Sequence, residues 1–592
     1  MKEIIFLSFG NFSNYVLSHF FNLNDEILKN EENPFSLNHT VIYNESERPR
    51  ALLFDYSNNI RRYYQTNEKL SNEAIESIAF EFKNQNLNDV EKNKFQIYQT
   101  FQNENNFLSL MTGINENDEL NEEEDENIIT TNKKNIKTKQ NKQKKELTPE
   151  EIKKREKINE LMDLSDEELY EYFDFENSIK NWNDFLRIKL PYNSLNEIKT
   201  IDYDIREQTS YIRGKDFLSK SYNNNSYYEE FEDNFRKQLE DCDRMEFLHF
   251  NMDYNSLWGG IGNYMLENIH EMIPKNIRII NGYDDTQNYN GNDNIFNIEK
   301  FVNNVWFLSD LLDIDGGNII FNPIYIKDNQ NCIKELFGYK YKENEDQIDP
   351  VYNFYYSSFC SLQLQLLYMP VRSNLYGKST YIRNLLTNES VLNLMESDLF
   401  LLLEDINNKL PKELITNGYL VNLSRNMYNK DFSWKKLLEM GIYLNKYNST
   451  ICFGIENNYK ILNQNYDVFL NKLSNVIFNS EEKFPLPICY PRKYYKILSE
   501  KNLYNYIESM SCLTNNRPYI DYAIKNLKNF KKDYKTYELS TLKYLAKIDK
   551  DKQFDYKDKC ESIFNMIYVY QDLAENMLNI FDDEESDSEP DI

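Results

Sequence analysis

The most constraining feature of the sequence is a buried strand followed by glycines and an amphipathic helix. The strand is predicted over Glu246–Asp253, and Gly259, Gly260 and Gly262 form a turn before the helix. In α/β proteins this order presents backbone N–H groups and a helix N-terminus to a phosphate group. Trp258, however, stands where the backbone of such a turn would approach a ligand. The pattern therefore predicts the scaffold of a nucleotide site with a reduced capacity to bind phosphate.

The flanking segments predict an α/β fold built on a parallel sheet. Lys2–Phe9 is a nearly continuous apolar run that ends at Gly10, and Asn11 or Ser13 can cap the helix that follows. A second buried strand is predicted over residues 50–55, so the order is strand, helix, strand. Further strands are predicted over residues 277–280 and 318–321, and helices over 231–242, 265–273 and 298–312.

The charge balance excludes one class of partner and favours another. The chain has 592 residues and a formal net charge of −28. Such an acidic protein repels phosphate backbones, so we expect no binding to nucleic acid through general electrostatics. Protein partners with basic surfaces are more easily accommodated.

The distribution of cysteines indicates a reducing compartment, and the hydropathy indicates a protein without a membrane span. The seven cysteines are scattered and include no CxxC pair, which is typical of buried thiols rather than of disulfides or a zinc site. No apolar run approaches 18 residues, so we expect no transmembrane segment. The N-terminus resembles neither a signal peptide nor a transit peptide, since the first arginine is Arg48. We therefore predict a cytoplasmic location.

Composition divides the chain into five parts. Residues 113–163 contain an acidic block and then a lysine-rich block with few apolar residues, which predicts a disordered charged insertion. This insertion separates two parts of an N-terminal domain, residues 1–112 and 164–350. Residues 351–580 are predicted to be mainly helical, notably over Ser358–Met369, Val391–Leu403 and Tyr504–Leu545, and residues 581–592 form an acidic tail.

No catalytic or metal-binding group can be anchored in the sequence. Gly377–Ser379 lacks the first glycine and the preceding strand of a phosphate-binding P-loop. The four histidines lie in separate elements, and His249 is predicted to be a core residue within an apolar strand. We therefore predict no catalytic residue, no metal site and no enzymatic activity.

The glycine segment has two interpretations. Gly260 and Gly262 either allow close packing of a tight connection or belong to a cradle whose amides bind a diphosphate or triphosphate. Trp258 favours packing because its large side chain needs core volume or a partner surface. The residues alone leave both interpretations open.

Several segments together resemble the tubulin/FtsZ-like class. Residues 1–5 with Gly10 and Asn14 resemble the first strand and first nucleotide loop of tubulins, and Arg48–Asp55 resembles their second-strand segment. A closer resemblance is to the Misato family, tubulin/FtsZ-like proteins with a divergent insertion. It is carried by the segments Trp182–Arg187, Glu240–Asp243, Asp253–Gly262 and Ser357–Arg372 and by the acidic tail.

The resemblance implies a fold and a degenerate nucleotide site. The fold is a tubulin/FtsZ-like parallel sheet with helices on both faces, followed by an α+β second domain and C-terminal helices. The candidate nucleotide-loop residues are Gly10, Asn11, Asn14, Gly259, Gly260 and Gly262. Phe12 and Trp258 stand where tubulins have smaller residues, and we find no tubulin-type hydrolysis motif. We therefore expect no GTP hydrolysis and no bound cofactor, while GTP binding stays open as an alternative.

The resemblance also implies a cellular role. Misato proteins are linked to mitochondrial distribution, inheritance and morphology, and in some cases to spindle microtubules and the tubulin-folding chaperonin. It implies a non-enzymatic protein that acts on mitochondria through protein contacts, with tubulin or the cytosolic chaperonin as candidate partners. It also implies a location in the cytoplasm or peripherally on the mitochondrial outer membrane. The alternatives are a GTP-binding protein of the tubulin class and an adaptor for spindle microtubules and the chaperonin.

Overall fold

In the computed structural model, the chain forms two compact units. The first comprises Met1–Ile60, Lys180–Trp182 and Leu190–Ile592, and the second comprises Arg61–Ile179 and Asn183–Lys189. The structure describes residues 3–29, 37–56, 59–60, 166–173, 175, 179–188, 190–198, 210–221, 226–284, 294–315, 318–326, 333–334, 339, 350–372, 392–402, 418–422, 427–432, 450–454, 476–480, 484–487, 489–491, 506–514, 517–548 and 552–586. The predicted insertion at residues 113–163 lies outside these ranges.

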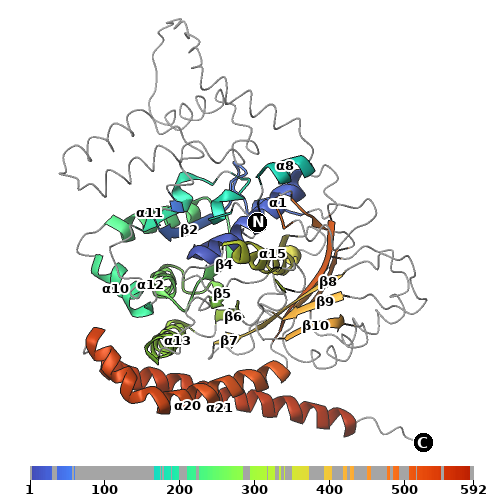
Figure 1. Cartoon of the computed structure of the whole chain (residues 1–592). Helices are drawn as coiled ribbons and strands as arrows, with labels where there is room; N and C mark the ends of the chain where they lie inside the picture. The colour runs from blue at the N-terminus through green and yellow to red at the C-terminus, as the bar shows by residue number, and fades with distance from the viewer. Residues whose placement is uncertain are drawn as a thin grey trace, which may run out of the picture. The chain divides into compact units, whose positions relative to one another are not determined.

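A parallel sheet of seven strands organises the first unit (Figure 1). Its order is β3-β2-β1-β4-β5-β6-β7, and every neighbouring pair is parallel. The strands are β1 (Glu3–Phe9), β2 (Ala51–Tyr56), β3 (Leu195–Ile198), β4 (Met245–Met252), β5 (Ile277–Asp284), β6 (Ile319–Tyr325) and β7 (Asn393–Leu394). The predicted parallel α/β sheet is thus confirmed, and the strands predicted from apolar runs all form.

Helices flank this sheet, as Figure 1 shows. The helix α1 (Asn11–Lys29) packs against α15 (Pro350–Arg372), and α10 (Tyr211–Ser221) packs against α12 (Leu257–Met272), which contacts α13 (Asn294–Asp315). The described residues before 350 also form α11 (Ser226–Glu240) and the short 3-10 turns η1 (His39–Val41), η2 (Trp182–Asp184) and η3 (Tyr192–Ser194). The helix α8 (Asp166–Phe173) belongs to the second unit.

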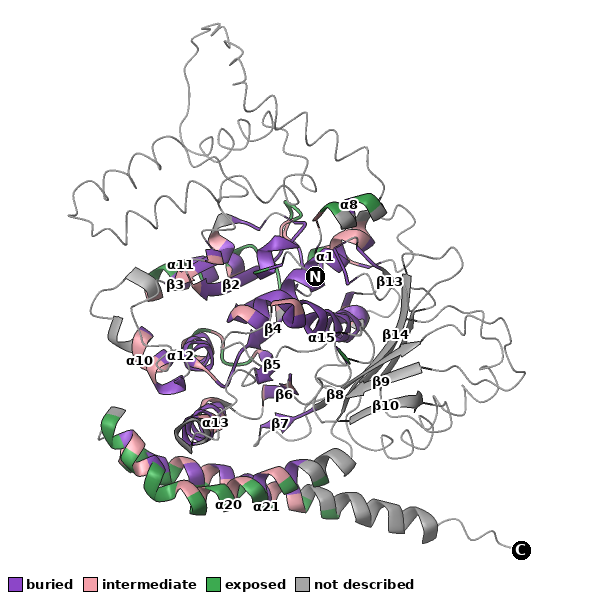
Figure 2. Ribbon diagram, viewed as in Figure 1, coloured by how far each residue is buried: buried purple, intermediate pink, exposed green. Residues whose placement is uncertain are grey.

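The two faces of the sheet differ in polarity. Toward α12 and α13, alternate residues such as Phe9, Phe250 and Ile280 form an apolar core. Toward α1 and α15, one register row carries polar side chains on four adjacent strands: Ser8, Asn251, Asn281 and Asn322. All four are fully buried, and Figure 2 shows the buried centre to which they belong.

The region predicted to be mainly helical, residues 351–580, contains a second sheet within residues 396–514, between helices. Its strands are β8 (Glu396–Leu402), β9 (Gly418–Asn422), β10 (Met427–Phe432), β11 (Thr450–Gly454), β12 (Val476–Ser480), β13 (Phe484–Pro485) and β14 (Tyr506–Thr514). Its order is β10-β9-β8-β14-β11-β12, with β13 paired to β14, and only β11 and β12 are parallel. The helix predicted over Val391–Leu403 is therefore wrong, and the one predicted over Tyr504–Leu545 begins as a strand. Short apolar runs do not distinguish a buried strand from a helix.

A long helical hairpin completes the described chain. It consists of α20 (Arg517–Ile548) and α21 (Lys552–Ser586), so the first residues of the predicted acidic tail are helical and residues 587–592 lie outside the described part. Lys559 of α21 forms an ion pair with the buried Asp310 of α13 at 2.6 Å, and Tyr544 of α20 donates to Glu299 at 3.1 Å. These contacts fix the hairpin on α13. Among the described helices, none is long and apolar enough to span a membrane.

Candidate functional site

The candidate site lies where the order of the parallel strands reverses direction. The chain passes from β1 through α1 to β2 on one side, and from β4 through α12 to β5 on the other (Figure 1). In open α/β sheets, ligands bind at this switch point, outside the carboxyl ends of the strands. Of the six predicted site residues, Gly10 lies in the loop β1–α1, Asn11 and Asn14 lie in the first turn of α1, and Gly259, Gly260 and Gly262 lie in α12. The topology therefore brings them to the carboxyl ends of β1 and β4, the position of the crevice in such sheets.

The N-terminus of α1 is capped by the carboxylate of Asp253. Its Oδ2 accepts a hydrogen bond from the Phe12 amide at 3.1 Å, and its Oδ1 accepts from the Ser13 amide at 3.0 Å. The Ser13 hydroxyl also donates to Oδ1 at 2.6 Å. The first turn of α1 contains no acidic residue of its own, so Asp253 supplies the negative charge that a helix N-terminus favours. The predicted local cap by Asn11 or Ser13 is replaced by the side chain of the residue that directly follows β4.

Gly10 makes room for this carboxylate. Its φ of 111° is accessible mainly to glycine, and a Cβ atom at this position would collide with the Asp253 side chain. The amide of Asp253 donates to the Phe9 carbonyl at 3.0 Å, which joins the ends of β1 and β4 next to the cap. Gly10 therefore allows the Asp253 carboxylate to approach the N-terminus of α1.

Asn14 and Asn11 have different surroundings. The Asn14 side chain is buried and donates to the Phe54 carbonyl at 3.1 Å and to Asp55 at 3.4 Å. It thereby links α1 to the end of β2. Asn11 is the first residue of α1 and is half-buried.

A second buried carboxylate, Asp55, lies close to the first. It accepts hydrogen bonds from the Trp182 indole at 2.7 Å, from Asn59 at 2.9 Å and from the Tyr56 amide at 2.7 Å. Burial raises the pKa of Asp55, although these donors oppose the increase. Burial also raises the pKa of Asp253 to about 7, against the hydrogen bonds from Ser13 and Phe12, and the charge of Asp55 raises it further. An incoming phosphate would meet these two acidic groups.

The helix on the other side of the crevice, α12, carries its own cap. The Ser256 hydroxyl accepts from the Trp258 amide at 3.2 Å and donates to the Asp253 carbonyl at 2.6 Å. Both helix N-termini at the switch point are thus capped by side chains of the chain itself.

The three glycines lie inside α12 rather than in a turn before it. A Cβ on Gly259 would collide with the Tyr254 carbonyl, and one on Gly260 would collide with the Tyr211 carbonyl of α10. At Gly262 the nearest atoms would be the Met252 methyl at 3.0 Å and the Phe9 ring at 3.3 Å. Close packing against the neighbouring loop, helix and sheet therefore accounts for the glycine pattern.

The two bulky residues of the predicted loops pack in separate places. Phe12 is fully buried, with ring centroids 5.1 Å from Tyr283 and 6.0 Å from Tyr356 of α15. Trp258 is 5% exposed and packs on Tyr56 at 4.8 Å, within the core on the α12 side. Each ring fills core volume next to one of the two loops.

Below the crevice, His249 is a satisfied core residue, as predicted. Its Nε2 lies 3.3 Å from Asn251 Oδ1 and its Nδ1 lies 2.5 Å from the Tyr368 hydroxyl of α15. The Tyr283 hydroxyl donates to the same Asn251 oxygen at 2.7 Å. Burial lowers the pKa of His249 to about 3, so the ring is neutral at physiological pH.

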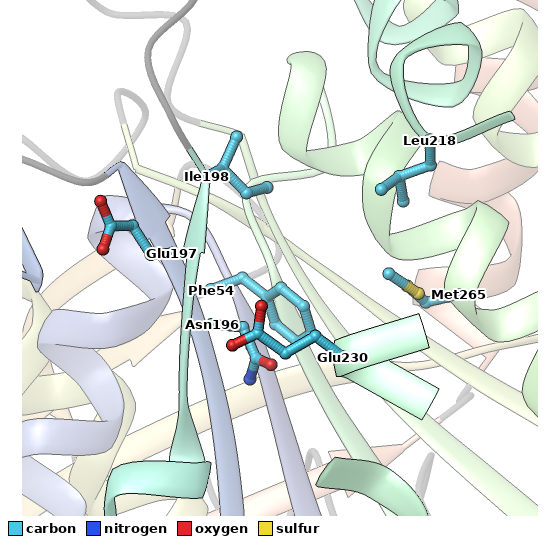
Figure 3. Close-up of a pocket in the computed structure, with 7 residues that line it drawn as sticks. All are labelled: Phe54, Asn196, Glu197, Ile198, Leu218, Glu230 and Met265. Carbon is cyan, nitrogen blue, oxygen red and sulfur yellow. The ribbon is translucent and has the colours of Figure 1, made fainter. Parts of the chain in front are cut away.

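A small cavity of about 20 Å³ lies on the α12 side of the sheet, among β3, α10, α11 and α12 (Figure 3). Phe54, Leu218 and Met265 supply most of its apolar wall, and Asn196 and Glu230 add polar groups. Its volume is close to that of one water molecule, so it does not accommodate a nucleotide.

The residue that dominates the crevice, Asp253, was not among the predicted site residues. It directly follows a buried strand and precedes the glycine segment. Its role depends on pairing between β1 and β4, because 240 residues separate it from Ser13. Two features of the sequence together could have indicated this role. An acidic residue follows a central strand, and the first turn of α1 has no acidic residue of its own.

Comparison with protein families supports the resemblance. Residues 2–157 match the model of the Misato Segment II tubulin-like domain, which covers β1, α1 and β2. The suspected Misato resemblance is confirmed over this segment, and the described fold carries a tubulin-like domain. No curated protein matches the chain.

Substitution of the helix glycines tests their packing role. Gly260→Ala should lower the free energy of unfolding by about 1–3 kcal/mol, because a backbone carbonyl of α10 cannot yield to the added methyl group. Gly262→Ala is the matched control: it meets the mobile end of Met252 and gains about 1 kcal/mol of helix propensity. Denaturant unfolding of both variants measures the difference. Equal losses in the two variants would contradict the packing assignment.

The Asp253 carboxyl group should make stability depend on pH. Its pKa is higher in the folded state than in the unfolded chain, so the folded state binds an extra proton between about pH 4 and pH 7. The resulting stabilisation is complete below pH 4, decreases as the pH rises and is lost above about pH 7. The expected change is on the order of 4 kcal/mol at most.

The variant Asp253→Asn isolates this effect, because it keeps an acceptor oxygen while removing the titrating group. The difference in unfolding free energy between the wild type and this variant should change between pH 4 and pH 7 and stay constant from pH 7.5 to pH 9. Asp55→Asn serves as a control that retains Asp253. A pH-independent difference would show that Asp253 has an ordinary pKa.

Proposed function

We propose that the protein is a non-enzymatic, tubulin-like factor of the Misato type. In this proposal it acts in mitochondrion organisation, meaning the distribution, inheritance and morphology of mitochondria, through contacts with other proteins. It is placed in the cytoplasm and peripherally on the mitochondrial outer membrane. The match of residues 2–157 to the Misato segment supports the family part of this proposal. The cellular role is the further step that the proposal takes from that resemblance.

The observation that carries the non-enzymatic part is the Asp253 cap on α1. A phosphate at this helix would need the Phe12 and Ser13 amides, which already bind a carboxylate. Displacement would cost the three hydrogen bonds to Asp253 and would leave a buried acidic group without its donors. The N-terminus of α12 is also capped, by the Ser256 hydroxyl, so this helix does not need an anionic ligand either.

A GTP-binding protein of the tubulin class is the second candidate. Gly10 in the loop β1–α1 and Asn14 in the first turn of α1 lie at the switch point, where the topology favours a ligand. In that case Asp253 would leave α1 when the nucleotide bound, and protonation of its carboxyl group near neutral pH would ease this movement.

Nucleotide binding distinguishes the two candidates. We expect the purified protein to release no guanine nucleotide on denaturation and to show no saturable GTP binding up to millimolar concentration, because Asp253 occupies the α1 amides. Chromatography of the denatured extract and isothermal titration calorimetry provide the measurements. A GTP-dependent rise in the thermal unfolding midpoint would instead support the second candidate, because a ligand that binds the folded state stabilises it.

Removal of the protein from its own cells tests the proposed role. We expect mitochondria to become clustered or fragmented and to be unequally inherited. Re-expression of the wild type should restore them, and so should Asp253→Asn if that variant folds, because the proposed role needs no nucleotide. Light microscopy of labelled mitochondria provides the measurement. Normal mitochondrial distribution after complete depletion would refute the proposed role.

A further inference from the structure

We propose that the outward face of α20 is a docking surface for an extended acidic polypeptide segment of a partner protein. The surface, named here the lysine stripe, consists of six exposed lysines: Lys525, Lys528, Lys532, Lys535, Lys543 and Lys547. Their spacing of three, four or eight residues places them on one side of the helix.

The opposite side of α20 is committed to the core. Ala523, Ile524, Leu527 and Leu545 are buried, and Phe530 packs against Phe301 of α13 at 4.6 Å. The lysine stripe therefore faces away from the protein, as the exposed residues of α20 in Figure 2 indicate. Lys531 is separate from the stripe, because its ammonium lies 5.1 Å from the Phe564 ring of α21.

The charge of α20 contrasts with that of the whole chain. The net charge of the protein is −28, yet α20 carries seven lysines and Arg517 against the acidic residues Asp521, Asp533 and Glu538. Lys528 and Lys532, and also Lys543 and Lys547, are like-charged pairs four residues apart, which destabilise a helix slightly. An acidic ligand would relieve this repulsion.

The shape of the stripe favours a narrow ligand over a planar membrane or a nucleic-acid duplex. Among its described side chains, the neighbouring α21 exposes five acidic ones, and a broad anionic surface resting on α20 would also approach these: Asp555, Asp558, Glu561, Asp572 and Glu575. From Lys525 to Lys547 the stripe is about 33 Å long. An extended peptide of about ten residues spans that length.

One apolar side chain lies within the stripe. Leu539 is 75% exposed, between Lys535 and Lys543 on the same side of α20. A matching apolar residue in the acidic segment would bury this leucine, so we expect the partner segment to carry one between its carboxylates.

The test is an anisotropy titration of the full-length protein with a fluorescein-labelled peptide of 12 residues, made of glutamate and serine with one central leucine. The stripe variant combines Lys525→Gln, Lys528→Gln, Lys532→Gln and Lys535→Gln. The control variant removes the same charge from exposed lysines elsewhere: Lys237→Gln, Lys275→Gln, Lys334→Gln and Lys557→Gln.

The stripe variant should bind the peptide at least tenfold more weakly than the wild type, and the control variant should stay within twofold. Wild-type binding should also weaken as salt is added, because the contacts are exposed charges. Circular dichroism should give the stripe and control variants the same thermal unfolding midpoint. If the stripe variant is destabilised, the two-lysine variant Lys525→Gln with Lys528→Gln replaces it.

Three results would overturn the proposal: no peptide binding by the wild type, equal loss in the stripe and control variants, or stripe-dependent binding to phosphatidylserine vesicles without peptide binding. The last result would assign the stripe to a membrane surface instead.

Discussion

The centre of the molecule depends on the contact between the Asp253 carboxylate and the N-terminus of α1. A helix that starts at the switch point of a parallel sheet leaves amides that need an acceptor, and its dipole favours a negative charge there. In a nucleotide-binding protein a phosphate can meet that need. Here the end of β4 meets it, in a contact that Gly10 makes sterically possible.

This contact also couples the crevice to the sheet. Asp253 can reach Ser13 only after β1 and β4 have paired, since 240 residues separate the two in the chain. The cap on α1 therefore depends on the pairing of the two central strands. Opening the crevice to a ligand would remove a buried cap next to the polar row on β1, β4, β5 and β6, whose side chains depend on local hydrogen bonds such as that between Asn322 and Asn281.

Five of the seven strands of the parallel sheet, β1, β2, β4, β5 and β6, could be predicted because each is a short apolar run bounded by polar or glycine residues. The short edge strands β3 and β7 were not predicted. The sequence also identified the two loops that meet at the crevice. The roles of their residues could not be predicted, because Gly260 is explained by a carbonyl of α10 and Asp253 by an amide of α1. Residues 396–402 formed a strand where a helix was expected, since their partners in β9 and β14 are distant in sequence and periodicity does not reveal them.

The distribution of charge bears on where such a protein can recognise others. Two acidic side chains, Asp55 and Asp253, are buried at the crevice, where desolvation raises their pKa values and where their hydrogen bonds are made internally. Groups committed in this way have little binding capacity to offer. The six lysines on α20 are exposed and are held in a row by a helix whose other side packs on α13. Because the helix sets their spacing in advance, binding there orders fewer side chains and costs less conformational entropy than binding to lysines on a flexible chain. The proposed docking surface therefore places recognition on the outer helix rather than at the switch point of the sheet.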